Sequence, residues 1–496
     1  MRYKRKLYFC LMRYIIVLPF VIFFSTSVFA QEKWDLRRCV DYAIQNNIFV
    51  KQQELQTGFA ALSEKQMKLS AYPNANFNSN SGFQSGRSVD PTTNLYTTNQ
   101  LLFQQFNLSA DIVIFNWGKV KNSLVAAQLD SKAAQAGVEK ARNDIALSVA
   151  TAFLQALLNK EQIGIAEIQF QQTKSQLEAT RKRVDAGTLP ELSAVEIEAQ
   201  LARDSTSIIN ARATADLSLL GLKAYLNLDA AAPFEIEIPP VEIIPVEKIA
   251  DLQPDYVFQM ALQNQPAQKL NQLKLQSYQA NVKVSKAVMY PTFSGFLGLG
   301  TNFSNPFKSI TNVDFTGYGA PNPSLGAVNV SGTNYFIQPP KFDYTQTSKS
   351  FGQLWDGYFG QLDNNFRQNF GFGLSVPIFN GSNAKTGYER AKLNVKNAEL
   401  TIQQADQQLK QDIYQAYTNA TAALQRYNAS EVTLRTSQKT YDYARKRYDV
   451  GLLGTFELIT NQNNLNRAMT DKLVAEYEYV FRMKVLEFYK GQGIKL

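Results

Sequence analysis

The segment that decides the fold runs from Leu409 to Gly451 and reads LKQDIYQAYTNATAALQRYNASEVTLRTSQKTYDYARKRYDVG. Two rows of residues repeat along it with a period of seven. The first row holds the larger side chains: Ile413, Ala420, Tyr427, Leu434, Tyr441 and Tyr448. The second row holds mostly small ones: Leu409, Ala416, Ala423, Ser430, Ser437 and Ala444. The rows alternate at steps of four and three residues, a spacing that predicts a helix packed along a continuous seam.

The helix predicted by this pattern is unusually long. Pro377 is the last proline of the chain, so nothing in the sequence interrupts a helix over residues 382–450. At about 1.5 Å per residue it would be about 100 Å long, several times the usual helix length in a globular domain. Such a helix cannot bury itself in an ordinary core, and the small row predicts close approach of neighbouring helices. A generic long coiled coil is the simplest structure that fits these observations.

The long segment has a counterpart earlier in the chain. A shift of 264 residues, without a gap, aligns Ile114-Phe115-Asn116 with Ile378-Phe379-Asn380, and Arg181-Lys182-Arg183 with Arg445-Lys446-Arg447. A shift of 218 residues, again without a gap, aligns identical residues that end at Tyr72-Pro73 and Tyr290-Pro291. Self-similarity of this kind predicts an internal two-fold repeat.

Each copy of the repeat reads as helix, β-hairpin, long helix, turn and helix. For the first copy, residues 31–232, we predict an initial helix at 35–71, a hairpin at 74–115, a long helix at 118–186 and a final helix at 192–226. For the second copy, residues 255–496, the corresponding ranges are 255–289, 291–379, 382–450 and 456–489. A proline-rich linker, residues 233–254, joins the copies. Both initial helices end at Tyr-Pro, because the residue before proline is disfavoured in helical geometry.

Residues 1–30 have the features of a secretory signal peptide. Basic residues precede an apolar run over 15–24 and the sequence STSVFA, so we predict cleavage after Ala30. The formal net charge is +9, and removal of five basic leader residues, with no acidic ones, leaves +4 for the mature chain. So balanced a chain gives no indication of nucleic-acid binding.

The composition argues against an enzyme. The chain contains no histidine, which removes the usual general base, the commonest metal ligand and every Ser-His or Cys-His pair. The mature chain has one cysteine, Cys39, so it cannot form an internal disulfide. A phosphate-binding loop of the GxxxxGKS/T kind is also missing. We therefore predict no catalytic residues, no metal site and no cofactor.

The hairpins indicate where the protein resides. Apolar and polar residues alternate over 105–114 in the first hairpin and over 370–378 in the second. The preceding strands are predicted at 74–83 and 291–303. Four strands of about ten residues, with one apolar and one polar face, match the pattern of a membrane-spanning β-barrel. A soluble sandwich edge packed on one side is the alternative.

Closure of the barrel sets the number of chains. Four strands cannot close a barrel, and unpaired strand edges cannot lie in lipid. Several protomers must then share one barrel. Twelve strands from three chains are the simplest closure wide enough for a channel, whereas eight strands from two chains would be filled by side chains. The second hairpin also contains a longer insertion, predicted as an exterior loop over 304–368, which either gates the mouth, forms a surface epitope or is a tolerated insertion.

The turns RVDAGTL and RYDVGLL, together with the leader and the gapless duplication, resemble the TolC family of outer-membrane efflux proteins. The likeness covers nearly the whole mature chain. It implies an α+β membrane protein: a homotrimer with a shared twelve-stranded transmembrane β-barrel in the outer membrane and a long-helix α-barrel that extends into the periplasm. The resemblance also implies, as partners, a periplasmic adaptor (membrane fusion protein), an inner-membrane RND or ABC transporter, and outer-membrane lipid.

In this family the two turns lie at periplasmic tips that contact the adaptor. The resemblance therefore implies a docking set whose members are Arg183, Asp185, Gly187, Thr188, Leu189, Arg447, Asp449, Gly451, Leu452 and Leu453. The two glycines have a second interpretation, because glycine is the usual left-handed residue that ends a helix. The preceding arginines likewise suit the negative end of a helix dipole. The two interpretations are compatible.

The resemblance also places an aperture near the second turn, at Tyr448 and Glu457. Three symmetry-related Glu457 carboxylates around one axis would repel each other and attract cations. The first copy has Ser193 and Ala194 in the matching region, so only one acidic ring is expected. Alternatively, Glu457 is a helix N-terminal residue favoured by the dipole.

The predicted function is a passive exit duct of a tripartite efflux or type I secretion system. Substrate would enter from the inner-membrane pump through the adaptor and leave across the outer membrane without chemistry. A structural or adhesive stalk at the cell surface, built from the long coiled coil, is the alternative. The exported substrate and the pump class are not encoded in any recognisable motif.

Overall fold

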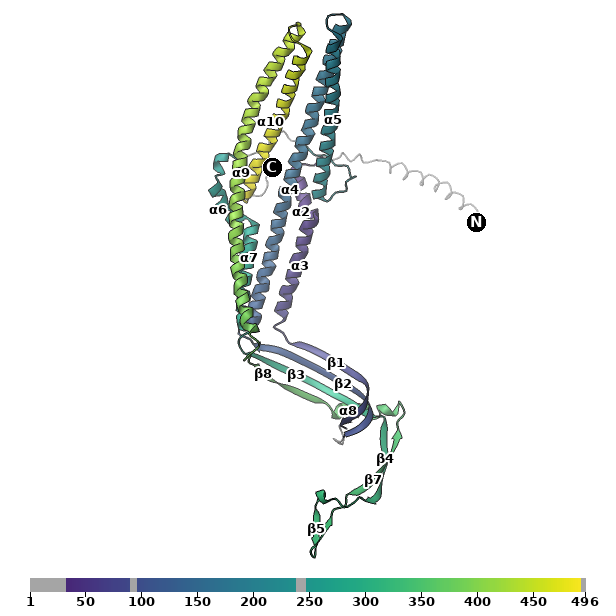
Figure 1. The fold of residues 1–496 in the computed structure, drawn as a ribbon. Helices are drawn as coiled ribbons and strands as arrows, with labels where there is room; N and C mark the ends of the chain where they lie inside the picture. The colour runs from purple at the N-terminus through teal and green to yellow at the C-terminus, as the bar shows by residue number, and fades with distance from the viewer. Residues whose placement is uncertain (1–32, 90–95, 238–246, 492–496) are drawn as a thin grey trace, which may run out of the picture. The chain divides into compact units, whose positions relative to one another are not determined.

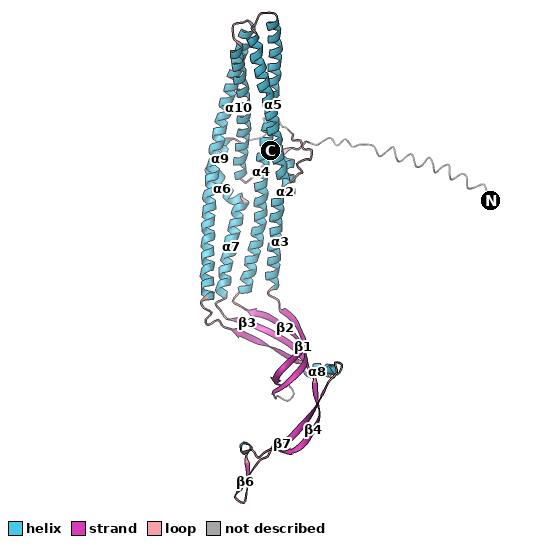
Figure 2. Cartoon of the chain, turned by 45° about the vertical axis from the view of Figure 1, so that its right-hand side comes forward, coloured by secondary structure: helices cyan, strands magenta, loops and turns pink. Residues whose placement is uncertain are grey.

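The computed structural model describes residues 33–89, 96–237 and 247–491. The leader predicted at 1–30 and its cleavage after Ala30 lie outside the described residues. The chain forms two compact units: one consists of the segments up to Ala61, Leu129–Gln276 and from Lys396 onward, and the other of Leu62–Gln128 and Ser277–Val395. The first is helical, and the second contains the strands (Figures 1 and 2).

Two helices of 67 residues dominate the described chain. Helix α4 spans Lys119–Asp185 and helix α9 spans Asn383–Asp449, where the sequence predicts 118–186 and 382–450. Each is followed by a shorter helix after a tight turn: α5 spans Glu191–Leu226 and α10 spans Thr455–Tyr489. Figure 2 shows the two resulting helix pairs, each closed by its turn. Among the described residues, none of the helices has both the length and the hydropathy to cross a membrane.

The initial helix of the first copy is divided, so the expectation of one helix over 35–71 is wrong. Helix α2, Leu36–Asn46, and helix α3, Ile48–Leu69, are separated by Asn47, whose backbone is extended. The Asn47 amide explains the break: its Oδ1 accepts from the Phe49 N–H at 2.9 Å and its Nδ2 donates to the Tyr225 carbonyl at 2.8 Å. These bonds replace helical backbone pairing and tie the break to α5.

The second copy has the same interruption. Helix α6, Pro254–Asn264, and helix α7, Pro266–Ala287, are separated by Gln265, so the helix predicted over 255–289 is also divided. Gln265 precedes a proline, which disfavours helical geometry at this residue. Its side-chain Nε2 donates to the carbonyls of Phe488 and Tyr489 at the end of α10.

Away from the tips, the core of the helical unit contains two clusters, one around α4 and one around α9. The first holds buried residues of α2, α4 and α5, among them Cys39, Phe153 and Leu222. The second holds buried residues of α6, α9 and α10: Val257, Ala261, Ile413, Ala416, Ala420, Met483 and Leu486, together with Leu252. The small residues of α9 therefore pack on helices of the same chain, because only alanine leaves room for the close approach of α6 and α10.

The second unit is built on a four-stranded antiparallel sheet with the order β1-β2-β3-β8. The strands are β1 (Asn74–Val89), β2 (Tyr96–Phe115), β3 (Thr292–Pro306) and β8 (Arg367–Ser375). Three of them are longer than the predicted ten or so residues. The outer edges of β1 and β8 pair with no other strand among the described residues.

The register gives the sheet one apolar and one polar face. In one row across the sheet, Phe77 of β1 pairs with Leu108 of β2, which pairs with Leu299 of β3. In another row, Ala110 of β2 pairs with Leu297 of β3, which pairs with Phe370 of β8. We call this the apolar face; its other members include Phe83, Phe106, Ile112, Phe303, Phe372 and Leu374. The polar face carries mainly amides, glycines and hydroxyls: Asn74, Asn76, Asn78, Asn80, Gln105, Asn107, Ser109, Gly298, Gly300, Asn302, Gly371 and Gly373. A Cβ at Gly371 would lie 2.8 Å from Phe296 Cζ, so a larger residue there would require the Phe296 ring to shift.

The insertion predicted as a loop over 304–368 is a folded segment. It contains β4 (Lys308–Tyr318) paired with β7 (Pro340–Ser348), β5 (Ala327–Val330) paired with β6 (Thr333–Phe336), and helix α8 (Tyr358–Asn364). The sequence did not indicate these strands, because the insertion is rich in turn residues. The pairing of β4 with β7 joins residues about thirty positions apart. In the predicted linker, Ile236 pairs with Trp34 and residues Ile249–Asp251 form a 3-10 helix; residues 238–246 lie outside the described part.

The packing around α9 predicts a marked cost for enlarging Ala420, which is fully buried. We expect Ala420→Leu to lower the free energy of unfolding by about 1–3 kcal/mol, because extra methylene groups must displace α6 or α10. Thermal unfolding followed by far-UV circular dichroism measures the effect. The control is Gln403→Leu on the exposed face of the same helix; equal midpoints for the two variants would contradict the packing described.

Candidate functional site

The first helical tip is a compact turn between α4 and α5. Gly187 follows α4 with a φ of 72°, and its N–H donates to the Val184 carbonyl at 2.8 Å. The Thr188 N–H reaches back to the Arg183 carbonyl at 2.9 Å, and the Thr188 hydroxyl bonds the same oxygen at 2.8 Å. These two backbone bonds define a Schellman motif, which satisfies the last carbonyls of a helix.

The second tip repeats this geometry between α9 and α10. Gly451 has a φ of 79°; its N–H donates to the Tyr448 carbonyl at 2.9 Å, and the Leu452 N–H donates to the Arg447 carbonyl at 2.8 Å. Neither Gly187 nor Gly451 has an atom within 4 Å of a built Cβ. The glycines are therefore required by backbone conformation and not by lack of space. The capping interpretation of both turns is confirmed.

The two tips share a small apolar core. Ala444, Tyr448 and Leu458 are buried there, and Leu189 of the first tip and Leu453 of the second pack against them with Tyr441. The leucines predicted to dock a partner thus lie partly inside the protein. By contrast, Asp185, Thr188 and Asp449 are exposed, and Leu452 is 69% exposed.

Tyr448 connects the two helix pairs. Its hydroxyl lies 3.1 Å from the hydroxyl of Thr180, which is fully buried on α4. The Arg183 guanidinium stands over the Tyr448 ring at 5.5 Å from the centroid, a distance at which a cation is attracted by the ring face. The ring itself is 3% exposed. In the single chain Tyr448 is therefore buried between α4 and α9, in contact with Thr180 and Arg183. That it belongs to an aperture stays a prediction.

Glu457 differs from Tyr448 because it reaches solvent. It lies in the first turn of α10, whose N-cap residue Gly454 supplies no side-chain hydrogen bond. A carboxylate at this position is favoured by the free N–H groups and the positive end of the helix dipole. Ser193 and Ala194, in the matching region of α5, are both buried.

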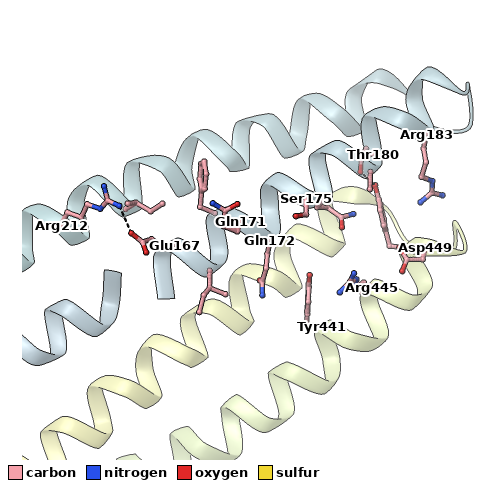
Figure 3. Close-up of a pocket in the computed structure, with 16 residues that line it drawn as sticks. Glu167, Gln171, Gln172, Ser175, Thr180, Arg183, Arg212, Tyr441, Arg445 and Asp449 are labelled. Atoms are coloured by element: carbon pink, nitrogen blue, oxygen red, sulfur yellow. Dashed lines mark hydrogen bonds and ion pairs between the residues drawn. The ribbon is translucent and has the colours of Figure 1, made fainter. Parts of the chain in front are cut away.

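A polar groove of about 810 Å³ runs along the helices beside the tips. Figure 3 shows its labelled side chains, which come from α4, α5 and α9. Arg212 pairs with Glu167 at 2.7 Å on one side. Toward the tips, Arg183, Arg445, Tyr441 and Asp449 line the groove. Burial raises the pKa of Tyr441 above its usual value, although the charge of Arg445 acts in the opposite direction, so the phenol stays a neutral hydrogen-bonding group.

A buried polar network that sequence reasoning missed joins α4, α5 and α10. The Asp204 carboxylate, 2% exposed, accepts from Gln169 Nε2 at 2.7 Å, Thr173 Oγ1 at 2.6 Å and Gln200 Nε2 at 2.8 Å. Gln462 of α10 donates to Thr173 Oγ1 at 3.0 Å. The only sequence signal for this network was Asp204, an acidic residue among the inward-facing residues of α5. Buried groups with satisfied hydrogen bonds of this kind specify which helices pack together.

The described residues do not suggest reaction chemistry. Among them, no group of three or more Cys, Asp or Glu side chains is placed to hold a metal ion. The chain's one described thiol, Cys39, is buried, and burial raises its pKa to about 12, which keeps it from acting as a nucleophile. What the tips combine is two capped turns, an apolar core that couples them and a polar groove.

In a comparison with known protein families, the family model described as "Outer membrane efflux protein" matches residues 65–228 and 340–491. Comparison with curated protein sequences gives no significant match.

Solved structures with the same fold include CusC, CmeC and VceC. CusC, whose structures are described in terms of transmembrane channel formation, is 16% identical, with a TM-score of 0.71 over 94% of this chain and 96% of its own. The Campylobacter jejuni outer membrane channel CmeC is 16% identical, with a TM-score of 0.70 over 93% of this chain and 86% of its own. The Vibrio cholerae outer membrane protein VceC is 15% identical, with a TM-score of 0.70 over 93% of this chain and 97% of its own. At these identities the likeness establishes the fold.

The second turn offers a test of the capping geometry. Gly451→Ala should cost about 1–2 kcal/mol, because an L-residue with a side chain pays this much for a left-handed backbone. Gly454→Ser is the matched control: Gly454 has a φ of −74° at the N-cap, where serine is favoured. Thermal unfolding should show a lower midpoint for Gly451→Ala and an unchanged or higher one for Gly454→Ser. The reverse order would contradict the assignment of the turn.

Proposed function

Because this chain belongs to the outer membrane efflux protein family, we propose that it is the exit duct of a tripartite efflux or secretion system. In this proposal three copies form one channel, an adaptor docks at the helical tips, and an inner-membrane RND or ABC pump supplies both substrate and energy. The single observation that carries the proposal is the sheet β1-β2-β3-β8, with one apolar face and two unpaired edges.

The sheet supports a shared barrel by two physical requirements. Its apolar face carries Phe370 and Phe372, which are 83% and 72% exposed in the single chain; such a face is stable against lipid and costly against water. The unpaired backbone groups along the edges of β1 and β8 need hydrogen-bond partners within a bilayer. Joining β8 of one copy to β1 of the next supplies those partners, and three copies give twelve strands around a lumen lined by the polar face.

The tips support adaptor docking. Leu452 and Phe456 at the second tip and Leu192 at the first are exposed apolar residues, next to the exposed Asp185, Thr188 and Asp449. An apolar centre with a polar rim suits a protein partner. The groove that contains Arg445 and Arg212 lies along the same helices and gives a helical partner hydrogen-bonding groups along its length.

The aperture is proposed at the same tips. Glu457 is exposed there, and three symmetry-related carboxylates would favour cations over anions. Tyr448 would act from within the wall: its contacts with Thr180 and Arg183 hold α9 against α4, so loosening them would let the helix pairs separate. The sequence duplication, with α4-α5 and α9-α10 as matching pairs, would place six such pairs around the axis.

Channel conductance tests the duct. In planar lipid bilayers the purified protein should form a small, mostly closed, cation-preferring channel. Tyr448→Phe removes the hydroxyl contact, worth about 0.5–1.5 kcal/mol, and should raise the open fraction several-fold; Glu457→Gln should reduce cation preference. Silence of the wild type and of both variants would favour a structural stalk over a duct.

A complementation experiment tests the docking surface. A deletion strain should become sensitive to compounds in a broad panel or lose secreted proteins, and the wild-type gene should restore the phenotype. Leu452→Asp should fail to restore it, because the charge disrupts an apolar contact. Val432→Asp, at an exposed position on α9 away from the turn, is the control and should restore it. Full activity of Leu452→Asp would remove this leucine from the docking set.

A further inference from the structure

The two edge strands of the sheet differ in length. Strand β1 has 16 residues and β8 has 9, so a partner β1 paired along the whole of β8 leaves at least seven residues unpaired. Strand β1 begins directly after Pro73, and β8 ends at Ser375, shortly before Pro377. The first residue of β1 and the last residue of β8 therefore lie at the same end of the sheet, the end that the chain joins to helices. The extra residues of β1 lie at the other end, which is called the distal end.

At the distal end, α8 takes the place beside β3 that β8 leaves open. Strand β3 continues to Pro306, but β8 pairs with it only as far as Gly300. Beyond that point the Ser304 N–H donates to Gln361 Oε1 at 3.1 Å, and Asn365 Nδ2 donates to the Asn302 carbonyl at 2.8 Å. The Thr301 hydroxyl donates to the Leu362 carbonyl at 2.6 Å. The helix thus supplies hydrogen-bond partners to backbone groups of β3 that a neighbouring strand would otherwise pair with.

A buried cluster fixes α8 in this position. Phe303 and Leu354 are fully or almost fully buried, together with Leu102 of β2, and Tyr358 packs against them. The Tyr358 hydroxyl also donates to Gln104 Oε1 at 2.8 Å. The segment of 353–365, which comprises the 3-10 helix Gln353–Trp355 and α8, therefore packs on the distal apolar face of β2 and β3 as well as along the edge of β3, and is called the edge helix below.

The outward side of the edge helix is apolar and acidic. Phe359 is 82% exposed. Asp356 and Asp363 are exposed as well, and neither carboxylate forms an ion pair within the part of the chain that the structure describes. On the opposite edge of the sheet, β1 contains a single charged residue, Arg87. Its guanidinium stands over the Tyr96 ring at 5.5 Å from the centroid and has no carboxylate partner among the described residues.

We propose that the edge helix of one copy packs against residues 83–89 of β1 in the next copy, where Arg87 pairs with the exposed aspartates. The seam between protomers then has two parts: strand pairing of β8 with β1 near the helices, and helix-on-strand packing at the distal end. The inference rests on the proposed closure of the sheet by three copies. The unequal strand lengths require some group to cover the distal part of β1, and the edge helix lies on the same edge of the sheet.

Charge favours a protein partner over lipid for the edge helix. Two carboxylates per copy facing hydrocarbon would carry a large desolvation cost. Facing β1 of the next copy, they meet an arginine that its own chain leaves without an ion pair. The exposed Phe359 and Phe83 supply apolar contact beside this pair.

Cysteine cross-linking in the full-length protein, in membranes, tests the two parts of the seam separately. The distal variant carries Ser85→Cys and Phe359→Cys, and the helix-proximal variant carries Asn78→Cys and Gly373→Cys. A short bismaleimide reagent should convert both variants to covalent dimers and trimers on denaturing gels. Cys39 should not react, because it is buried and its pKa is about 12. The exposed Tyr335→Cys combined with Ser85→Cys is the negative control.

The outcomes separate the inference from the closure on which it rests. Cross-linking in the helix-proximal variant alone overturns the edge-helix contact and leaves the shared barrel intact. Cross-linking in neither variant overturns the closure itself. Protection of Phe359→Cys from the reagent, with access to a bilayer-restricted spin probe, would assign the edge helix to lipid and also overturn the inference.

A charge reversal gives an independent measurement. Arg87→Glu in the distal variant should reduce the rate of cross-linking several-fold, and adding Asp363→Lys should restore it. The helix-proximal variant carrying Arg87→Glu should cross-link at its original rate. Loss without restoration would overturn the pairing of Arg87 with Asp363.

Discussion

The physical constraint on which the structure depends is that backbone N–H and C=O groups cannot remain unpaired in a bilayer. In the four-stranded sheet β1-β2-β3-β8, neighbouring strands pair their backbone groups with one another. The backbone groups along the outer edges of β1 and β8 pair with no other strand among the described residues. The apolar face of the sheet is covered only around Leu102 and Phe303 by described residues of the single chain, and Phe370 and Phe372 are exposed. In the proposed assembly, other copies of the same sheet would pair the open edges, and lipid would cover the exposed part of the apolar face.

The helical unit solves a different problem, which is how to keep very long helices in place. The 67-residue helices α4 and α9 are too long for one core, so separate clusters hold them at intervals. Breaks at Asn47 and Gln265 help, since their side chains bond to the ends of α5 and α10. The buried Asp204 network adds a polar contact with defined geometry, which permits one alignment of α4, α5 and α10 and penalises others. At the tips, Tyr448 and Thr180 join the two helix pairs.

In the proposed docking surface, residues at the tips would combine a structural and a functional role. Gly187 and Gly451 end their helices through Schellman motifs, and this requirement alone accounts for glycine at both positions. Leu189 and Leu453 belong to the local core. The leucines that remain exposed for the proposed docking are therefore fewer than the motif suggests, and Leu452 is the exposed leucine of the second turn.

The sequence by itself determined the long helices, the turns between them and the strands with one apolar face, because each of these follows from local periodicity or from one conformational requirement. Leu409 to Gly451 predicts its helix through a seven-residue repeat, and glycine after RYDV predicts its end. Only the tertiary structure decided the burial of Tyr448, the division of the initial helices, the Asp204 network and the folding of the insertion into strands and α8. These depend on contacts between residues that are far apart in the chain, such as Asn47 with Tyr225 and Phe303 with Leu354, and no local pattern records which distant group will be there to accept or cover a side chain.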